Sequence, residues 1–294
     1  MVQGVEIVDG YIIDRDPATG EVIEKVKCAT PEEVDEVIEN ARNAFEDWHM
    51  NYSLDQRLIL LKEGLAALAV VRNDLALMIT REMGKVGSEA ADEVNGATDK
   101  AAWLELVADA NRPITVGKPD GGQAMIMRDA MGVVVVLAPW NFPADEILLL
   151  SLPALLAGNC VIVKPSEVAP LTGAMVVERL ASTLPAGALQ VCQGDGTVGA
   201  RLVAGAVDMV AMTGSSAVGK KLMAACAPDL KRLVLELGGK DPMVVFADAD
   251  LDRAAADAVA FSLLNCGQVH LLGVPTPGGA GFWSECANTY TACA

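Results

Sequence analysis

The strongest constraint on the fold of this chain is the alternation, from Gly132 onward, of short apolar runs with segments of helical spacing. The apolar runs lie at residues 133–137, 161–164, 189–192, 209–213, 233–237 and 243–246. Parallel strands are buried on both faces and are joined by crossover helices, so apolar runs between helices are typical of them. We therefore predict an α/β fold with a doubly wound parallel sheet. Ligands of such sheets bind beyond the carboxyl ends of the strands, so the residues after each run are the first candidates for a site.

The segment before the sheet is expected to be mainly helical. Thr30 and Ser53 each stand three residues before a Glu or a Gln, which is the capping-box pattern that begins a helix. Residues 88–110 show the pattern of one long helix. Residues 111–130 contain several Pro and Gly residues and predict a protruding hairpin that could contact another subunit, with a plain linker as the alternative.

Charge, apolar length and cysteine spacing narrow the functional classes. The formal net charge is −17, which argues against nucleic acid or an anionic membrane surface as a partner. The longest apolar stretches are shorter than a membrane span. The N-terminus shows neither a secretory signal nor a transit peptide, so a cytoplasmic location is expected. The cysteines and the two histidines lack zinc-ligand spacing, and we predict no metal site.

Two glycine-rich loops resemble phosphate-binding patterns, and both are incomplete. Residues 194–199 fit G-x-G-x-x-G, but no acidic residue follows at the distance that would bind a ribose. Residues 214–221 approach the P-loop, but Lys221 stands where a Ser or Thr would hold Mg²⁺. Each loop places backbone N–H groups at a helix N-terminus, where a phosphate binds well. Tight turns without a ligand are the alternative.

Further chemistry-bearing residues follow the other apolar runs. Lys164 and Glu167 combine a cation with a carboxylate that could accept hydrogen bonds from ribose hydroxyls, although such a pair alone can be a solvated turn. Asn141, between Pro139 and Pro143, could donate its amide N–H to a developing oxyanion. Glu236 lies at the tip of a very apolar run, where burial could adjust its carboxylate to act as a general base.

In this order the motifs resemble those of the NAD(P)-dependent aldehyde dehydrogenase family. The matching segments are Pro139–Pro143, Lys164–Glu167, Thr213–Ser215, Gly219, Glu236–Lys240, and Asn265 with Gly267–Gln268. The resemblance extends from near residue 10 to Val269. It implies a Rossmann-like domain and an oxidoreductase that oxidises a small aldehyde to a carboxylic acid with NAD(P)⁺. The family is homo-oligomeric.

The resemblance also assigns roles to individual residues. Asn141 is similar to the oxyanion donor, and Glu236 to the general base. The implied cofactor contacts are Trp140, Lys164, Glu167, Ser215, Gly219 and Leu237. Of these, Lys164 and Glu167 would hold the adenosine ribose, and Ser215 the pyrophosphate. Because the Glu167 carboxylate repels a 2′-phosphate, NAD⁺ is expected to be preferred, with NADP⁺ still possible through Lys164.

The sequence departs from the family at its nucleophile. In the family, Gly-Gln and one variable residue precede the catalytic cysteine, whereas here Val269 is followed by His270. An imidazole does not replace a thiolate in this chemistry, and Cys266 precedes the glutamine, so its side chain should face elsewhere. From His270 onward the sequence no longer resembles the family.

These observations predict three parts of the chain. Residues 1–240 would form the NAD(P)-binding domain, 241–269 the start of a truncated catalytic domain, and 270–294 an aberrant tail that does not resemble the family. The chain would then lack most of the family's subunit interface. The leading hypothesis is an aldehyde dehydrogenase by family whose own chain is catalytically impaired. The alternatives are a non-catalytic NAD-binding or regulatory subunit and, from the near P-loop, a phosphotransfer enzyme with Asp248 holding a metal.

Overall fold

The computed structural model describes residues 5–117, 121–239, 242–269 and 274–275. The chain divides into two compact units, Met1–Glu236 and Leu237–Ala294, and each is described by itself. No helix among these described residues is long and apolar enough to cross a membrane.

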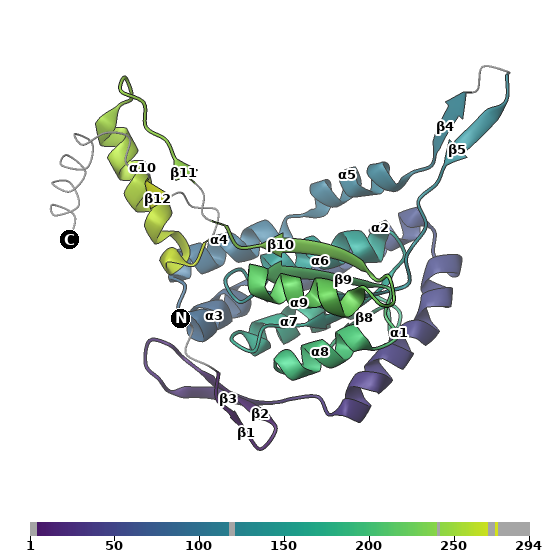
Figure 1. The fold of residues 1–294 in the computed structure, drawn as a ribbon, viewed down its shortest axis with the longest axis horizontal. Coiled ribbons are helices and arrows are strands. Elements are labelled where there is room, and N and C mark those ends of the chain that lie inside the picture. The colour runs from purple at the N-terminus through teal and green to yellow at the C-terminus, as the bar shows by residue number, and fades with distance from the viewer. Residues whose placement is uncertain (1–4, 118–120, 240–241, 270–273, 276–294) are drawn as a thin grey trace. The chain divides into compact units, whose positions relative to one another are not determined.

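The first unit is built around a five-stranded sheet in the order β10-β9-β6-β7-β8 (Figure 1). Its strands are β6 (Val133–Leu137), β7 (Cys160–Lys164), β8 (Leu189–Val191), β9 (Met209–Gly214) and β10 (Arg232–Leu237). β6 pairs in parallel with both β7 and β9, and β7 pairs in parallel with β8. The predicted doubly wound parallel sheet is therefore confirmed. The chain runs outward from β6 to β8 and then crosses to β9, so its direction reverses beside β6.

The connections between the strands are helices that cover both faces of the sheet. They are α6 (Asp145–Leu156), α7 (Pro170–Ala181), α8 (Gly196–Ala204) and α9 (Ser216–Cys226). α6 and α7 pack on one face, and α2 (Leu54–Ala69) contacts both of them. α1 (Pro31–Asn51) packs with α8 against the sheet. The strands in the middle are therefore buried on both sides, as their continuous apolar sequence predicts.

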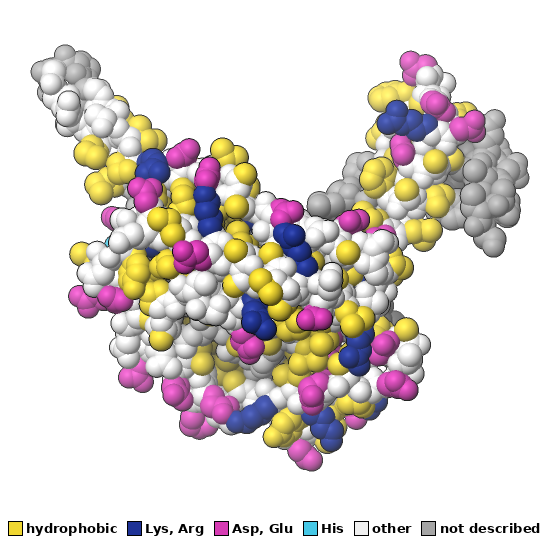
Figure 2. All heavy atoms as spheres, turned by 180° about the vertical axis from the view of Figure 1, so that it is seen from behind, with side chains coloured by type: hydrophobic (Ala, Val, Ile, Leu, Met, Phe, Trp, Pro, Cys, Tyr) yellow, Lys and Arg dark blue, Asp and Glu magenta, His cyan; other side chains and the backbone are white. Residues whose placement is uncertain are grey.

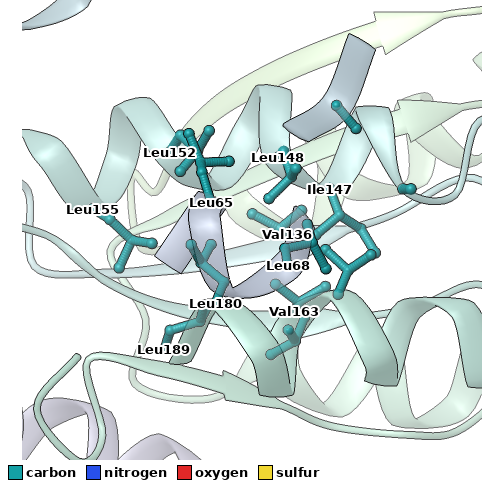
Figure 3. Close-up of a cluster of buried hydrophobic side chains, with 14 of the residues drawn as sticks. Leu65, Leu68, Val136, Ile147, Leu148, Leu152, Leu155, Val163, Leu180 and Leu189 are labelled. Atoms are coloured by element: carbon teal, nitrogen blue, oxygen red, sulfur yellow. The ribbon is translucent and has the colours of Figure 1, made fainter. Parts of the chain in front are cut away.

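The core of this unit consists largely of aliphatic side chains between the sheet and the helices. Val136 and Val163 from the strands meet Leu148 and Leu152 of α6 and Leu180 of α7 (Figure 3). All five are buried. Because protein interiors are close-packed, such a core holds the strand ends in a fixed relation to one another.

The N-terminal segment is less helical than predicted. Before the first helix, β1 (Ile7–Val8), β2 (Tyr11–Arg15) and β3 (Val22–Lys27) form a three-stranded antiparallel sheet. These strands are short and mostly exposed apart from the middle of β2, so they carry little apolar alternation. The capping boxes at Thr30 and Ser53 are present and begin α1 and α2 as expected.

The single helix expected over residues 88–110 is two helices, α4 (Gly87–Thr98) and α5 (Ala101–Asn111). Arg72, the first residue of α3 (Arg72–Met83), donates to the Thr98 hydroxyl at 2.7 Å and pairs with Asp99. These tertiary contacts hold the residues at which α4 ends. A break fixed by a residue so far away in sequence cannot be seen in helical periodicity.

A hairpin follows α5 and projects from the first unit (Figure 1). β4 (Ile114–Gly117) and β5 (Gln123–Ile126) pair antiparallel, as the Pro and Gly pattern predicted. Met125, Ile126 and Met127 are exposed. Figure 2 shows hydrophobic side chains toward the base of this hairpin, at its upper left.

The second unit contains α10 (Leu251–Leu263) and the short 3-10 helix η1 (Leu264–Gly267). β11 (Pro242–Met243) pairs in parallel with β12 (Val274–Pro275). The strand predicted at 243–246 is therefore wrong beyond Met243, and β11 does not join the five-stranded sheet. Val244 and Phe246 are exposed, so burial does not hold this run in a sheet.

Candidate functional site

Three of the sequence motifs meet at one edge of the five-stranded sheet. β6, β7 and β9 are neighbours and run in parallel, so their carboxyl ends lie side by side. The register pairs Leu137 with both Lys164 and Met212, which aligns the three strand ends across the sheet. The segments that follow them, 139–143, 165–167 and 213–215, therefore start from the same edge. This edge adjoins the point where the strand order reverses, where open α/β sheets bind ligands.

At the end of β7, Lys164 is buried and its ammonium is fully engaged within the chain. Its Nζ donates to the carbonyl oxygens of Pro165 and Gly194, each at 2.7 Å, and to Glu167 Oε2 at 3.1 Å. Lys164 is 6% exposed, whereas the Glu167 side chain is 35% exposed. The carboxylate therefore reaches solvent, while Lys164 would have to exchange one of its three acceptors to bind a ligand.

The first glycine-rich loop is closed by a side chain of its own. Asp195 is the N-cap of α8 and accepts from the backbone N–H groups of Thr197 and Val198. Partial burial acts to raise the pKa of Asp195, but the hydrogen bonds from Thr197 and Val198 outweigh it and lower the pKa. A carboxylate thus takes the helix terminus that the G-x-G-x-x-G pattern offered to a phosphate. A Cβ at Gly199 would lie 3.3 Å from Lys164 Cδ, so this glycine gives room to the lysine.

The second glycine-rich loop begins α9. Ser215 is exposed, and its Oγ accepts from the backbone N–H of Val218 at 3.3 Å. Gly219 is buried within the helix, and Lys221 is exposed. Thr213 donates to Glu146 Oε2 at 2.8 Å and so connects the end of β9 to α6. The N-terminus of α9 is capped by a neutral hydroxyl, which leaves it more favourable to an anion than the terminus of α8.

The segment between β6 and α6 is held by two side chains that the sequence analysis did not identify. Lys85 Nζ donates to the backbone oxygen of Asn141 at 3.0 Å and lies 4.0 Å from the centroid of the Phe142 ring. Lys85 also forms an ion pair with Glu93, and both side chains are 1% exposed. Burial raises the pKa of Glu93, and the positive charge of Lys85 opposes that rise.

Glu93 in turn caps the helix that follows. Its Oε1 accepts from the backbone N–H groups of Ala144 and Asp145, at 2.9 and 3.3 Å, where α6 begins. A sequence signal for Glu93 exists, because its place in α4 lies on the buried face that carries Ala90, Val94 and Ala97. A carboxylate on an apolar helical stripe needs a buried partner. Trp140 and Asn141, which this arrangement holds, are both half-buried.

A second buried carboxyl group lies at the start of α7. Glu82 accepts from the backbone N–H groups of Leu171 and Thr172, at 2.6 and 2.7 Å, and from the Thr172 hydroxyl. Burial raises the pKa of Glu82 to about 8, although the hydrogen bonds of Thr172 oppose this. Burial also raises the pKa of Asp14, which hydrogen-bonds to Glu82, to about 6. Near neutral pH Glu82 therefore retains its proton, whereas Asp14 loses its proton as the pH rises through about 6.

The remaining predicted residues lie at or beyond the boundary of the two units. Glu236 is exposed on the edge strand β10, so the described residues provide no burial that would desolvate its carboxylate, and the expectation of a buried Glu is wrong. Leu237, next to it, is half-buried. Asn265 is buried in η1, and Cys266 is exposed. His270 lies outside the described residues. Within those residues, no group of three or more His, Cys, Asp or Glu side chains is placed to hold a metal.

Comparison with known proteins identifies what this arrangement is similar to. The model described as "Aldehyde dehydrogenase family" matches residues 8–271. The D-glyceraldehyde dehydrogenase (NADP(+)) of Picrophilus torridus is 34% identical over 256 residues, which are 86% of this chain and 52% of that protein. The chain thus spans about half the length of this curated relative.

Solved structures agree in fold. An E. coli NADP-dependent enzyme superimposes with a TM-score of 0.88 at 29% identity, over 96% of this chain and 60% of that one. PnpE in complex with nicotinamide adenine dinucleotide has a TM-score of 0.89 at 28% identity, over 97% of this chain and 59% of that one. The family match covers most of the sequence, and the strand-end motifs lie within it, so this chain belongs to the aldehyde dehydrogenase family.

Proposed function

We propose that this chain binds a nicotinamide adenine dinucleotide at the carboxyl edge of its five-stranded sheet and belongs to a protein that oxidises a small aldehyde to a carboxylic acid with NAD(P)⁺. The observation that supports the proposal is the meeting of the Asn141, Lys164–Glu167 and Ser215 segments at three adjacent strand ends. The names of similar proteins support it as well, since one is an NADP(+)-linked glyceraldehyde dehydrogenase and another was solved with the dinucleotide.

The residues at this edge have the chemistry that a dinucleotide needs. The partly exposed Glu167 carboxylate can accept hydrogen bonds from ribose hydroxyls, and Lys164 orients it through their ion pair. Ser215 lies at a helix N-terminus that favours a pyrophosphate. We assign Trp140 and Leu237 to the wall of the cofactor path, and Gly219 to the close approach of α9. The bound cofactor would supply the hydride acceptor.

Two residues are assigned to the aldehyde chemistry itself. Asn141 would donate its side-chain amide to the oxygen of the substrate carbonyl as negative charge develops there. Glu236 would accept the proton of the water that releases the acid, and its exposure on β10 leaves it open to solvent. The position at which a nucleophilic cysteine is expected holds His270, so we propose that catalysis by this chain is impaired.

Cofactor preference is the finer part of the proposal. Glu167 places a negative charge where the 2′-phosphate of NADP⁺ would lie, so NAD⁺ should bind more tightly. Two similar proteins carry NADP in their names, and Lys164 remains the feature of this chain that could accommodate the phosphate. Comparing the two dissociation constants by calorimetry tests the preference, and equal or tighter binding of NADP⁺ would reject it.

Partners and location remain proposals from the sequence. Lys and Arg side chains are scattered among Asp and Glu side chains on the face shown in Figure 2, and together with the net charge of −17 this supports the exclusion of nucleic acid. The apolar side chains of the β4–β5 hairpin support a role as an oligomer contact. A cytoplasmic location remains a prediction.

Two measurements on the full chain test the proposed function. Calorimetric titration with NAD⁺ should show binding, and a flat titration at millimolar cofactor would reject the cofactor site. Incubation with a panel of aldehydes and NAD⁺ should produce no NADH above a control without enzyme. Robust turnover would refute the proposed impairment, while binding without turnover also fits the non-catalytic NAD-binding subunit.

The phosphotransfer alternative has less support. Lys221 is exposed on α9 and supplies no hydroxyl for Mg²⁺. Asp248, the proposed metal ligand, lies in the second unit and is exposed. Competition of Mg-ATP against NAD⁺ would distinguish the two hypotheses, and we expect Mg-ATP not to displace NAD⁺.

A further inference from the structure

The buried Lys85–Glu93 ion pair contacts the segment after β6 at several successive residues. Lys85 reaches the backbone oxygen of Asn141 and the ring of Phe142. Glu93 reaches the backbone N–H groups of Ala144 and Asp145. The contacts to the segment are therefore to main chain or to the face of a ring, and none of them requires a functional side chain of the segment.

We propose that Lys85 and Glu93 are positioning residues that hold residues 139–145 in the conformation that presents Trp140 and Asn141 to the reacting end of the cofactor. This inference deepens the proposed function and rests on it for the identity of the ligand. The conformation of residues 139–145 is shown directly by the structure, so that part of the inference does not depend on the proposed function.

Burial explains why this pair acts as a rigid support. Both side chains are 1% exposed, so neither charge can exchange its partner for water. The Glu93 carboxylate bridges the ammonium and the first backbone N–H groups of α6, and the ammonium bridges the carboxylate and the Asn141 carbonyl. The middle of the segment and its C-terminal end are thus tied to the same ion pair. Small displacements of groups near a reacting centre are known to be costly, which gives such a support its value.

Other ion pairs of this unit differ from the Lys85–Glu93 pair in exposure. Lys100 pairs with Asp145 at 2.7 Å, but its side chain is 15% and that of Asp145 30% exposed. Lys62 pairs with Glu105 between α2 and α5, where both side chains reach solvent. Lys62 therefore offers a matched control, because its substitution also breaks a lysine–glutamate pair but leaves residues 139–145 untouched.

The test uses the full chain and the variants Lys85→Met, Glu93→Gln, their double variant and Lys62→Met. Hydrogen exchange of the peptide that covers residues 139–145 is measured without any ligand. We expect exchange at least about tenfold faster in Lys85→Met and Glu93→Gln than in the wild type, and no change in Lys62→Met. Wild-type exchange in both single variants would overturn the inference, whatever the ligand.

The double variant separates positioning from stability. Removing one partner leaves a buried charge uncompensated, whereas removing both does not, so the double variant should melt closer to the wild type than either single variant. Its peptide 139–145 should still exchange fast, because the bond from Lys85 to Asn141 is lost. Restoration of both stability and wild-type exchange in the double variant would show that the pair only stabilises the fold.

Ligand binding then links the segment to the cofactor. Lys85→Met and the double variant should bind NAD⁺ roughly tenfold more weakly while keeping wild-type affinity for AMP, which lacks the nicotinamide half. Equal weakening of both ligands would refute the link to the reacting end. A wild-type chain that binds neither ligand would instead reject the proposed function, and the exchange measurement would still decide the role of the pair.

Discussion

Replacing Gly173 by alanine should strain the cofactor edge through a single methyl group. Gly173 lies in the first turn of α7, opposite Pro165, the residue directly after Lys164. A Cβ at this position would lie 2.4 Å from Pro165 Cβ and 2.5 Å from its Cγ. Carbon atoms prefer separations of about 3.5–4.0 Å. Because the proline ring cannot rotate away, either α7 or the 164–167 segment must move.

The magnitude follows from two opposing terms. Overpacking of this kind costs about 1–3 kcal/mol, and alanine in place of glycine in a helix gains up to about 1 kcal/mol. We therefore expect the free energy of unfolding to fall by about 0–2 kcal/mol in Gly173→Ala. Gly96→Ala is the matched control, because Gly96 lies within α4 and a Cβ there meets nothing within 4 Å. Its unfolding free energy should rise, so the two variants should differ by about 1–3 kcal/mol.

Urea unfolding and calorimetric titration with NAD⁺ measure the two consequences. Besides the difference in stability, Gly173→Ala should weaken NAD⁺ binding by about tenfold, equivalent to 1.4 kcal/mol, because Lys164 and Glu167 move with Pro165. Gly96→Ala should bind as the wild type does. Equal stability of the two variants together with wild-type affinity in Gly173→Ala would refute the argument that close packing fixes this segment.

Three further results are expected. Since Glu82 retains up to about pH 8 a proton that the unfolded chain has released, the unfolding free energy should fall as the pH rises from about 6 toward 8, by at most about 1.4 kcal/mol per pH unit for this one proton. Glu82→Gln should flatten this fall, and parallel stability profiles of the variant and the wild type would contradict the argument. Glu167→Ala should lower the ratio of the NADP⁺ to the NAD⁺ dissociation constant about tenfold, because a negative charge that repels the 2′-phosphate is removed. Calorimetry with both cofactors measures this ratio, and an unchanged ratio would contradict the prediction. Leu152→Ala should lower the unfolding free energy by about 2–5 kcal/mol in urea denaturation, since Leu152 is fully buried; a loss below 1 kcal/mol would mean that the core collapses around it.

The five-stranded sheet could be predicted because its inner strands are buried on both faces, and a strand buried in this way is a continuous run of apolar residues. The N-terminal sheet was missed because most of its strands lack such burial. β1 and β3 are largely exposed, and no alternation marks them. The end of α4 also escaped prediction, because Arg72 of another helix contacts it.

The candidate site likewise contains residues that could be predicted from the sequence and residues that could not. Its strand-end segments could be predicted because each is a short motif placed directly after an apolar run. Glu93 was missed, since a charged residue within a helical pattern is normally taken to face solvent. Lys85 was missed because it lies in the short connection between α3 and α4, where a lysine is also expected to be exposed. Their burial depends on the Phe142 ring and on the first turn of α6, which are far away in sequence.

The unequal capping of α8 and α9 makes the electrostatic potential differ between the two ends of the binding edge. Asp195 brings a full negative charge to the start of one helix, whereas Ser215 brings only a hydroxyl to the start of the other. A diphosphate approaching this edge is therefore repelled on the β8 side and attracted on the β9 side. The two helix termini would therefore place the pyrophosphate of a bound dinucleotide at the start of α9, and its two nucleoside halves would extend to either side of that point.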